Sequence, residues 1–510
     1  MKSSSELFDL IKSLTKSEKR FFKLSSSLQA GDKNYLKLFD EIEKQEAYDE
    51  KALKQTFKKE SFIKHLPSEK NHLYRIILKS LRSFHADRSV SSILRQEIKN
   101  IEILFFKALY KECGKFIARA KKTAYEYEKF YYLFELINWE KQLLEEAIEH
   151  GHFDTNINEL LEEEGLVIEK LRNLAEYQML YSKINYLYRS GGFSRNESER
   201  KEVDAIAEHP LIKGKNTALS VRAASICYYI QGLCAATNRD YDLSYIKFLK
   251  VKSILDDNPK IKEDLPKRYI RAIKNLLYCY IESGNLGEAE ALIAEMRDLI
   301  KQKGFDNTDS EVKIFTASYI AELLINDRRG DFKKSLKTAD EITEGMSKYG
   351  DKINKEQLIV FYYNLAYVYF GNQEYNQALK WVNILLNDNE QKLRQDIYNF
   401  SRFFNLVIHF ELQNYELIEY LLKSTNRYLK KLEKEYQSEQ VILKYFRKLS
   451  KHQSESSRID TFIEFKDKLD ELLKNPKEQV ILQYFDFPSW IDSKIKKIPL
   501  SEAIKQRHDD

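Results

Sequence analysis

The chain has 510 residues, and its 84 Lys and Arg nearly balance 79 Asp and Glu, giving a formal net charge of +5. Only 15 Gly and 7 Pro are present and 32% of the residues are charged, which argues against a turn-rich β fold and favours long helices with solvated outer faces. Aromatic residues are numerous, with 33 Tyr and 29 Phe, and such rings commonly fill wide gaps between helices.

Residues 1–90 predict a small domain of short helices. The first helix is amphipathic, because Asp9 and Lys12 interrupt its apolar residues, so it lacks the unbroken apolar core of a secretory signal. The longest apolar run, 359–370, contains Asn364 and is too short to cross a bilayer. We therefore expect a cytoplasmic protein without a membrane segment, and the frequent Lys, Ile, Asn and Tyr suggest a bacterial source.

The second half of this domain is basic. Residues 51–100 contain 12 Lys and Arg against 4 Asp and Glu. On the helix expected after Pro67, three basic residues recur at helical spacing opposite the apolar face: Arg75, Lys79 and Arg82. Such a stripe is either a solvated face, a patch for an acidic protein surface, or a contact for nucleic acid phosphates. The third alternative gives the competing function, a nucleic-acid-binding regulator that uses residues 51–90.

Residues 91–215 predict divergent helical hairpins with dense aromatic residues, and the paired glycines in 189–196 mark the clearest break in the chain. Beyond it, over 216–436, one local pattern recurs five times. A short polar or Gly-containing turn precedes an aromatic residue or Leu, and a small or aliphatic residue follows three positions later. The last residues of the copies are spaced 45, 46, 43 and 40 apart. The five copies are 239–244, 284–289, 330–335, 373–378 and 413–418.

This pattern is typical of a helical hairpin whose turn ends one helix and caps the next. The small residue lets the two helices approach closely, and each hairpin covers its open face only against its neighbour. Two copies resemble tetratricopeptide repeats, a family of 34-residue helix–turn–helix units, most clearly over 265–300 and 355–390. The residues that carry the resemblance are Leu276, Leu277, Tyr280, Gly284, Ala289 and Met296 in one copy, and Leu365, Ala366, Tyr369, Tyr375, Ala378 and Leu385 in the other.

The resemblance implies an all-α fold in which stacked helical hairpins form a right-handed superhelical array, a TPR-like α-solenoid. An N-terminal helical domain precedes the array, and residues 437–510 supply C-terminal helices. These include the aromatic cluster 484–490 around Trp490. An aromatic cluster after a repeat array either caps its last apolar face or serves as a docking motif for another protein, and both alternatives stand at this stage.

No catalytic constellation is present in the sequence. It lacks a Gly-rich phosphate loop and the common metalloprotease and hydrolase motifs. His150 and His152 are the closest histidine pair and have no further ligand nearby in sequence. The four cysteines, Cys113, Cys227, Cys234 and Cys279, form no C-x-x-C pair and are expected to be buried thiols. We therefore expect neither an enzyme nor a bound metal or cofactor.

The family resemblance also implies a binding surface, because the first helix of each tetratricopeptide hairpin lines a concave groove. Asn275 and Asn364 fall on the same family position, where an amide can bond to an extended peptide backbone. The alternative is that these residues simply pack between helices. The groove candidates are Arg271, Lys274, Asn275, Tyr278, Tyr363, Asn364, Tyr367 and Phe403. The predicted function is a non-enzymatic scaffold or regulator that binds a protein or peptide in this groove, with partner and oligomeric state left open.

Overall fold

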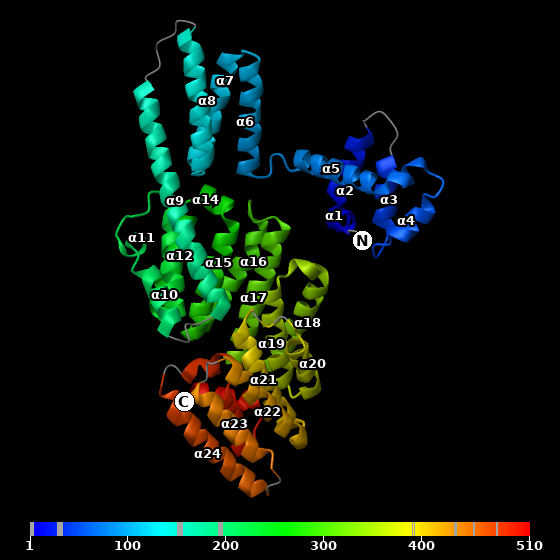
Figure 1. The fold of residues 1–510 in the computed structure, drawn as a ribbon. Coiled ribbons are helices and arrows are strands. Elements are labelled where there is room, and N and C mark those ends of the chain that lie inside the picture. The colour runs from blue at the N-terminus through cyan, green and yellow to red at the C-terminus, as the bar shows by residue number, and fades with distance from the viewer. Residues whose placement is uncertain are drawn as a thin grey trace. The chain divides into compact units, whose positions relative to one another are not determined.

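The computed structural model describes residues 5–27, 34–149, 157–191, 197–389, 391, 393–432, 436–451, 454–475 and 478–509. Every regular element in these residues is a helix, and they contain no strand, which confirms the all-α prediction (Figure 1). The chain forms two compact units, 1–164 and 165–510. The finer four-part division stays a prediction. None of the described helices combines the length and the apolar character that crossing a membrane requires.

The first unit begins with short helices that share one core. Leu38, Phe39, Leu73 and Ile77 have no exposed surface there. Asp49 caps one of these helices by accepting hydrogen bonds from two backbone amides, as an N-cap residue does. The helices are α1 (Glu6–Ser13), α2 (Lys16–Ser27), α3 (Asn34–Lys44), α4 (Glu50–Thr56), the 3₁₀ helix η1 (Ser61–His65) and α5 (Leu66–Phe84).

Longer helices follow, and α7 packs on both α6 and α8. The division between the two units falls within α9. The bounds are α6 (Val90–Phe106), α7 (Tyr110–Glu126), α8 (Phe130–Glu149) and α9 (Ile157–Gly191).

The second unit is a succession of paired helices, drawn one after another from green to orange in Figure 1. The first helices α15, α17 and α19 each pack on their own partner and on the first helix of the following pair, as α15 does on α16 and α17. The bounds are α10 (Glu197–Ala207), α11 (Pro210–Lys213), α12 (Val221–Thr237), α13 (Tyr241–Asp256), α14 (Pro259–Asp264), α15 (Pro266–Glu282), α16 (Leu286–Asp298), η2 (Leu299–Lys301), α17 (Thr308–Arg328), α18 (Phe332–Tyr349), η3 (Gly350–Lys352), α19 (Lys355–Gly371), α20 (Tyr375–Leu386), α21 (Gln395–Glu411), α22 (Tyr415–Leu432), α23 (Gln437–Leu449) and α24 (Glu455–Leu473).

All five turns that the repeated pattern predicts are turns between paired helices, and they share one backbone geometry. In each, a residue with positive φ follows the first helix, and the next backbone amide donates to the carbonyl five residues earlier, as in Asn285 N to Tyr280 O at 2.9 Å. This is the hydrogen bond of a Schellman helix end. The small or aliphatic residue of every copy is completely buried. The positive-φ residues are Arg239, Gly284, Gly330, Gln373 and Gln413.

The same turn occurs twice more in the first unit, where the sequence pattern did not predict it. Ala108 between α6 and α7 and Glu128 between α7 and α8 have positive φ. The amides of Leu109 and Lys129 donate to carbonyls five residues earlier. The residues five positions after each turn, Cys113 and Leu133, are again buried. Neither turn has a Gly, Asp or Asn in or next to it, and that is the signal by which the five other turns were recognised.

The chain ends in a segment that packs back on the paired helices. It comprises η4 (Glu478–Gln483), α25 (Phe487–Lys496) and α26 (Leu500–Asp509). Trp490 is 1% exposed, its ring stacks on Phe446 at 5.6 Å, and its Nε1 donates to Glu411 at 2.6 Å. Phe485 and Phe487 are also buried. This is the packing of a cap, and it leaves these three rings no surface that a docking partner could read.

Candidate functional site

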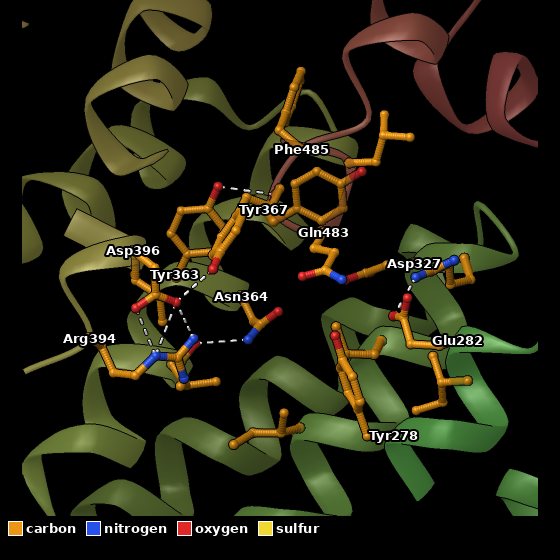
Figure 2. A pocket seen from close by; sticks show the side chains of 18 of the residues that line it. Tyr278, Glu282, Asp327, Tyr363, Asn364, Tyr367, Arg394, Asp396, Gln483 and Phe485 are labelled. Carbon is orange, nitrogen blue, oxygen red and sulfur yellow. Dashed lines mark hydrogen bonds and ion pairs between the residues drawn. The ribbon is translucent and has the colours of Figure 1, made fainter. Parts of the chain in front are cut away.

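A cavity of about 420 Å³ lies within the second unit, on the side formed by the first helices of the pairs (Figure 2). Its walls come from α9, α15, α17, α19 and the start of α21, and the second helices of those pairs do not contribute. The chain's own C-terminal segment completes the wall with 482–486 and two residues of α26. The first helices therefore enclose a chamber together with a distant part of the chain.

Tyrosine rings and amides form much of this wall. Figure 2 shows Tyr278, Asn364 and Gln483 around one space, brought there by α15, α19 and η4. The hydroxyl of Tyr363 donates to the backbone carbonyl of Tyr484 at 3.0 Å, and burial raises the pKa of Tyr363. These contacts keep the tyrosine side chains neutral and fix the C-terminal segment across the first helices.

The C-terminal stretch 482–486 is held at the start of α21 by contacts with an ion pair. The Arg394 guanidinium binds both carboxylate oxygens of Asp396, with Nη2 to Oδ2 at 2.6 Å, and the Tyr484 hydroxyl donates to the same Oδ2 at 2.6 Å. The Tyr484 ring stacks on Phe400 with centroids 4.1 Å apart. Arg394 has a φ of 51°, which is unusual for a residue with a side chain. The bidentate ion pair with Asp396 fixes the position of the Arg394 guanidinium next to this left-handed backbone.

Two further ion pairs lie in the wall. Arg328 contacts Glu282 at 2.6 Å, and Arg507 contacts Asp486 at 2.6 Å. Each of these cations thus already has a carboxylate. The cavity wall carries both signs of charge in matched pairs rather than a field of one sign.

Asp327 is the exception among the carboxylates. It is 7% exposed, its Oδ1 accepts a hydrogen bond from the Ser335 hydroxyl at 3.0 Å, and its Oδ2 has no hydrogen-bond partner in the described part of the chain. Burial raises the pKa of Asp327 to about 8. At neutral pH this carboxyl is therefore mostly protonated and uncharged.

A cluster of basic and phenolic side chains adjoins the cavity on α9, α12 and α15. Arg271 Nη1 donates to the Tyr181 hydroxyl at 2.5 Å, and Arg222 pairs with Asp264. Arg268 lies over the Tyr181 ring at 5.9 Å and forms no ion pair with a described residue. Burial, and then the guanidinium groups of Arg222 and Arg271, lower the pKa of Arg268 to about 10.

The structure brings most of the predicted groove residues to one place. The six that line the cavity are Lys274, Asn275, Tyr278, Tyr363, Asn364 and Tyr367. Arg271 lies beside it on α15 and is half-buried. Phe403 has no exposed surface and packs in the core of α19, α21 and the C-terminal segment, so a partner cannot contact it in this conformation.

The two asparagines already have intramolecular partners. Asn275 Nδ2 donates to the Tyr229 hydroxyl at 3.2 Å, and Asn364 Nδ2 donates to the Val360 carbonyl one turn earlier at 2.8 Å. These contacts match the alternative in which the amides bond to neighbouring helices. Their role toward a peptide backbone stays a prediction.

Sequence reasoning missed several wall residues. Tyr188 lies on α9, before the recognised repeats, and Gln483 and Arg507 lie after them. Asp327 stands three residues before the recognised copy 330–335, and the sequence around it does not indicate that its carboxyl is buried. Only the aromatic cluster 484–490 drew attention to this segment, and the sequence interpreted it as a cap or a docking motif, not as part of a cavity wall.

The basic stripe of the first unit lies where the sequence placed it. Arg75, Lys79 and Arg82 are exposed on α5, on the side away from the buried Leu73 and Ile77. None of the three basic residues forms an ion pair with a described residue. They are therefore available to an external anion.

Groups of three or more His, Cys, Asp or Glu in metal-binding arrangement do not occur among the described residues; His150 and His152 lie outside them. The four cysteines are buried and unbridged, and burial raises the pKa of Cys234 to about 12 and of Cys279 to about 11. Thiols of this kind are poor nucleophiles at neutral pH.

No protein-family model matches the chain, and no curated protein is significantly similar to it in sequence, so any function rests on the geometry of these sites.

Proposed function

We propose that the chain is a non-enzymatic scaffold that binds a protein or peptide on the side formed by the first helices of its pairs. One observation carries the proposal. The first helices α15, α17, α19 and α21 pack one on the next and line one cavity, and on that side α15 offers the exposed Lys274 and the half-buried Arg271. Cationic side chains on a helical surface are suited to carboxylates of a partner chain.

The fold that this function implies is a TPR-like α-solenoid, a right-handed superhelical array. The first-to-first packing of α15, α17, α19 and α21 supports it, because stacked hairpins bury their open faces only against their neighbours. The repeat spacing of 40 to 46 residues is longer than the 34 of the tetratricopeptide family. A bacterial source and a cytoplasmic location complete the proposal, on the sequence grounds given above.

The partner surface is proposed at the α12 and α15 end. The C-terminal segment already covers the first helices at the α19 and α21 end, where Tyr363, Phe400 and Phe404 contact Tyr484 or Phe485. A partner would meet Arg271 and Lys274 instead. The tyrosines Tyr278 and Tyr367 and the amides of Asn275 and Asn364 then belong to the chamber beneath.

A charge-matched pair of double variants tests this surface. Arg271→Gln with Lys274→Gln removes two cations at the proposed surface, and Arg172→Gln with Lys183→Gln removes two exposed cations of α9. The parent and the α9 variant should capture the same proteins from native lysate. The α15 variant should capture at least tenfold less of them, since a loss of about 1.4 kcal/mol in binding free energy weakens affinity tenfold. Equal capture by all three proteins contradicts the proposed surface.

A second candidate function uses the first unit. The observation that favours it is the exposed stripe of Arg75, Lys79 and Arg82, none of which forms an ion pair with a described residue. The test is fluorescence anisotropy with labelled duplex DNA and with RNA at rising salt. Binding that falls steeply with salt and is lost in the triple Gln variant would replace the protein-binding proposal with a nucleic-acid-binding one.

A further inference from the structure

The charges around the cavity are compensated. Its arginines are paired with Glu282, Asp396 and Asp486, and the two remaining ionised residues of the wall, Lys274 and Glu356, have opposite signs. Asp327 is mostly uncharged at neutral pH because burial raises its pKa to about 8. A ligand with a net charge would meet no uncompensated charge here and would still lose its hydration.

The remaining wall is aromatic and aliphatic with separate amide groups. Tyr188, Tyr278 and Tyr367 supply ring surface, and Ile320, Leu324 and Val360 supply aliphatic surface. Rings of this kind bind other rings by offset or edge-to-face packing, worth about 0.5–1.5 kcal/mol per pair beyond area burial.

Amide groups supply hydrogen-bonding positions in this largely apolar wall. Gln357 and Gln483 reach it from α19 and from η4. A small number of placed polar groups in a largely apolar pocket orients a bound molecule.

The volume limits what fits. About 420 Å³ lies within the range of roughly 300–1,000 Å³ that holds drug-sized ligands. The C-terminal segment lies across the space, because Gln483 Nε2 donates to the Tyr241 hydroxyl at 2.8 Å and Tyr363 donates to the Tyr484 carbonyl. A long peptide or a helix therefore has no through path beside this segment.

From the paired charges, the ring-lined walls and the volume, we propose that the cavity, which shares only Lys274 with the proposed protein-binding surface, is a binding site for an uncharged aromatic small molecule. The bound molecule contacts the first helices on one side and the C-terminal segment on the other. Its binding therefore stabilises the closed arrangement of that segment, since a ligand that binds only the folded state raises its stability.

A matched pair of dyes tests the ligand class. Anilinonaphthalene is an uncharged aromatic whose fluorescence rises in apolar surroundings, and its sulfonate derivative has the same rings with one negative charge. We expect the full-length chain to bind the uncharged dye one-to-one and at least tenfold more tightly than the sulfonate. No saturable one-to-one binding of the uncharged dye overturns the proposal, and equal affinities overturn the assignment of an uncharged ligand.

Cavity-filling variants test the place. Leu324→Trp and Val360→Trp add ring volume from two different helices of the wall, and Leu249→Trp adds the same ring at an exposed position of α13 that is not part of it. Each cavity variant that keeps the parent's helical circular dichroism should lose at least tenfold in dye affinity, whereas the control keeps it. Unchanged dye binding in the folded cavity variants shows that the dye binds elsewhere and overturns the proposal.

Discussion

The two ends of the face built by the first helices differ in what covers them. At α21, Phe400, Phe403 and Phe404 are buried beneath the C-terminal segment. At α15, Arg271 is half-buried and Lys274 is exposed. Helical pairs with the same turn geometry thus have buried first-helix residues at one end of this face and accessible ones at the other. What decides the outcome is a segment that lies far along the chain, since Tyr484 is 121 residues from the Tyr363 that binds it.

The covered end is most sharply tested at Trp490. Its ring lies among Phe410, Phe446 and Phe462, and Trp490→Ala would leave a large void there. Replacing a buried Trp by Ala typically costs about 3–5 kcal/mol, and the loss of the bond to Glu411 adds to it. Urea unfolding followed by circular dichroism measures the change.

Trp381→Ala is the matched control. Trp381 on α20 is only partly buried, and its ring stacks on Tyr362 of α19 at 5.6 Å. We expect a clearly smaller loss there. Equal losses at the two positions would mean that the C-terminal segment adds little to the covered end.

The boundary between the two ends contains Asp327, and its titration gives a pH-dependent prediction. The folded-state pKa of about 8 is raised above the ordinary value of about 3.9, so the folded state holds the proton more tightly than the unfolded state. Stability therefore decreases as pH rises from about 4 to about 8 and is independent of this group outside that window.

Asp327→Asn should remove this pH dependence. The variant's melting temperature relative to the parent's should rise across the window, reaching an advantage equivalent to a few kcal/mol at its upper end. Asp351→Asn, at an exposed carboxylate, is the control. If the difference in melting temperature between the parent and Asp327→Asn does not change with pH, the Asp327 carboxyl is ionised in the folded protein.

The close approach of paired helices should be alike at both ends. Ala289 in the α15–α16 pair and Ala378 in the α19–α20 pair have no exposed surface. Replacing either by Leu overpacks the contact and should cost about 1–3 kcal/mol. Thermal unfolding of both variants checks this, and a parent-like melting temperature for either one would mean that its pair has room that the burial does not reveal.

The sequence was sufficient to predict local structure. Five turns were placed correctly because a polar or Gly-containing turn, an aromatic residue or Leu, and a small or aliphatic residue recur at fixed spacing, although only two of the five turns have Gly at the left-handed position. The turns at Ala108 and Glu128 were missed because no Gly, Asp or Asn stands in or next to either turn, unlike in the five recognised copies. There the tertiary packing of α6, α7 and α8 overrides the local preference.

The candidate site was predictable only in part, for a related reason. The resemblance to tetratricopeptide repeats predicted Lys274, Asn275 and Tyr278 on the groove side of their helix, and the structure brings them to the cavity. No period within a helix encodes that residues 482–486 cross the same space, and none distinguishes Phe403, which is buried, from Lys274, which is exposed. Such features depend on contacts between distant segments, which a single sequence does not display.

The smallest predicted effect concerns the turns themselves, which use Gly at one position and Gln at another. Gln373 has a φ of 65° and an exposed side chain, whereas Gly284 has a φ of 76° with open space where a side chain would begin. Left-handed backbone costs a residue with a side chain about 1–2 kcal/mol, and the greater freedom of Gly in the unfolded chain offsets about 0.5–1 kcal/mol of that. Gln373→Gly should therefore raise the free energy of unfolding by up to about 1 kcal/mol, and Gly284→Ala should lower it by a similar amount. Urea titrations of both variants against the parent measure these opposite signs. If both substitutions destabilise, the side chain of Gln373 makes a favourable contact that outweighs its backbone cost, and the turns at the two ends are not equivalent.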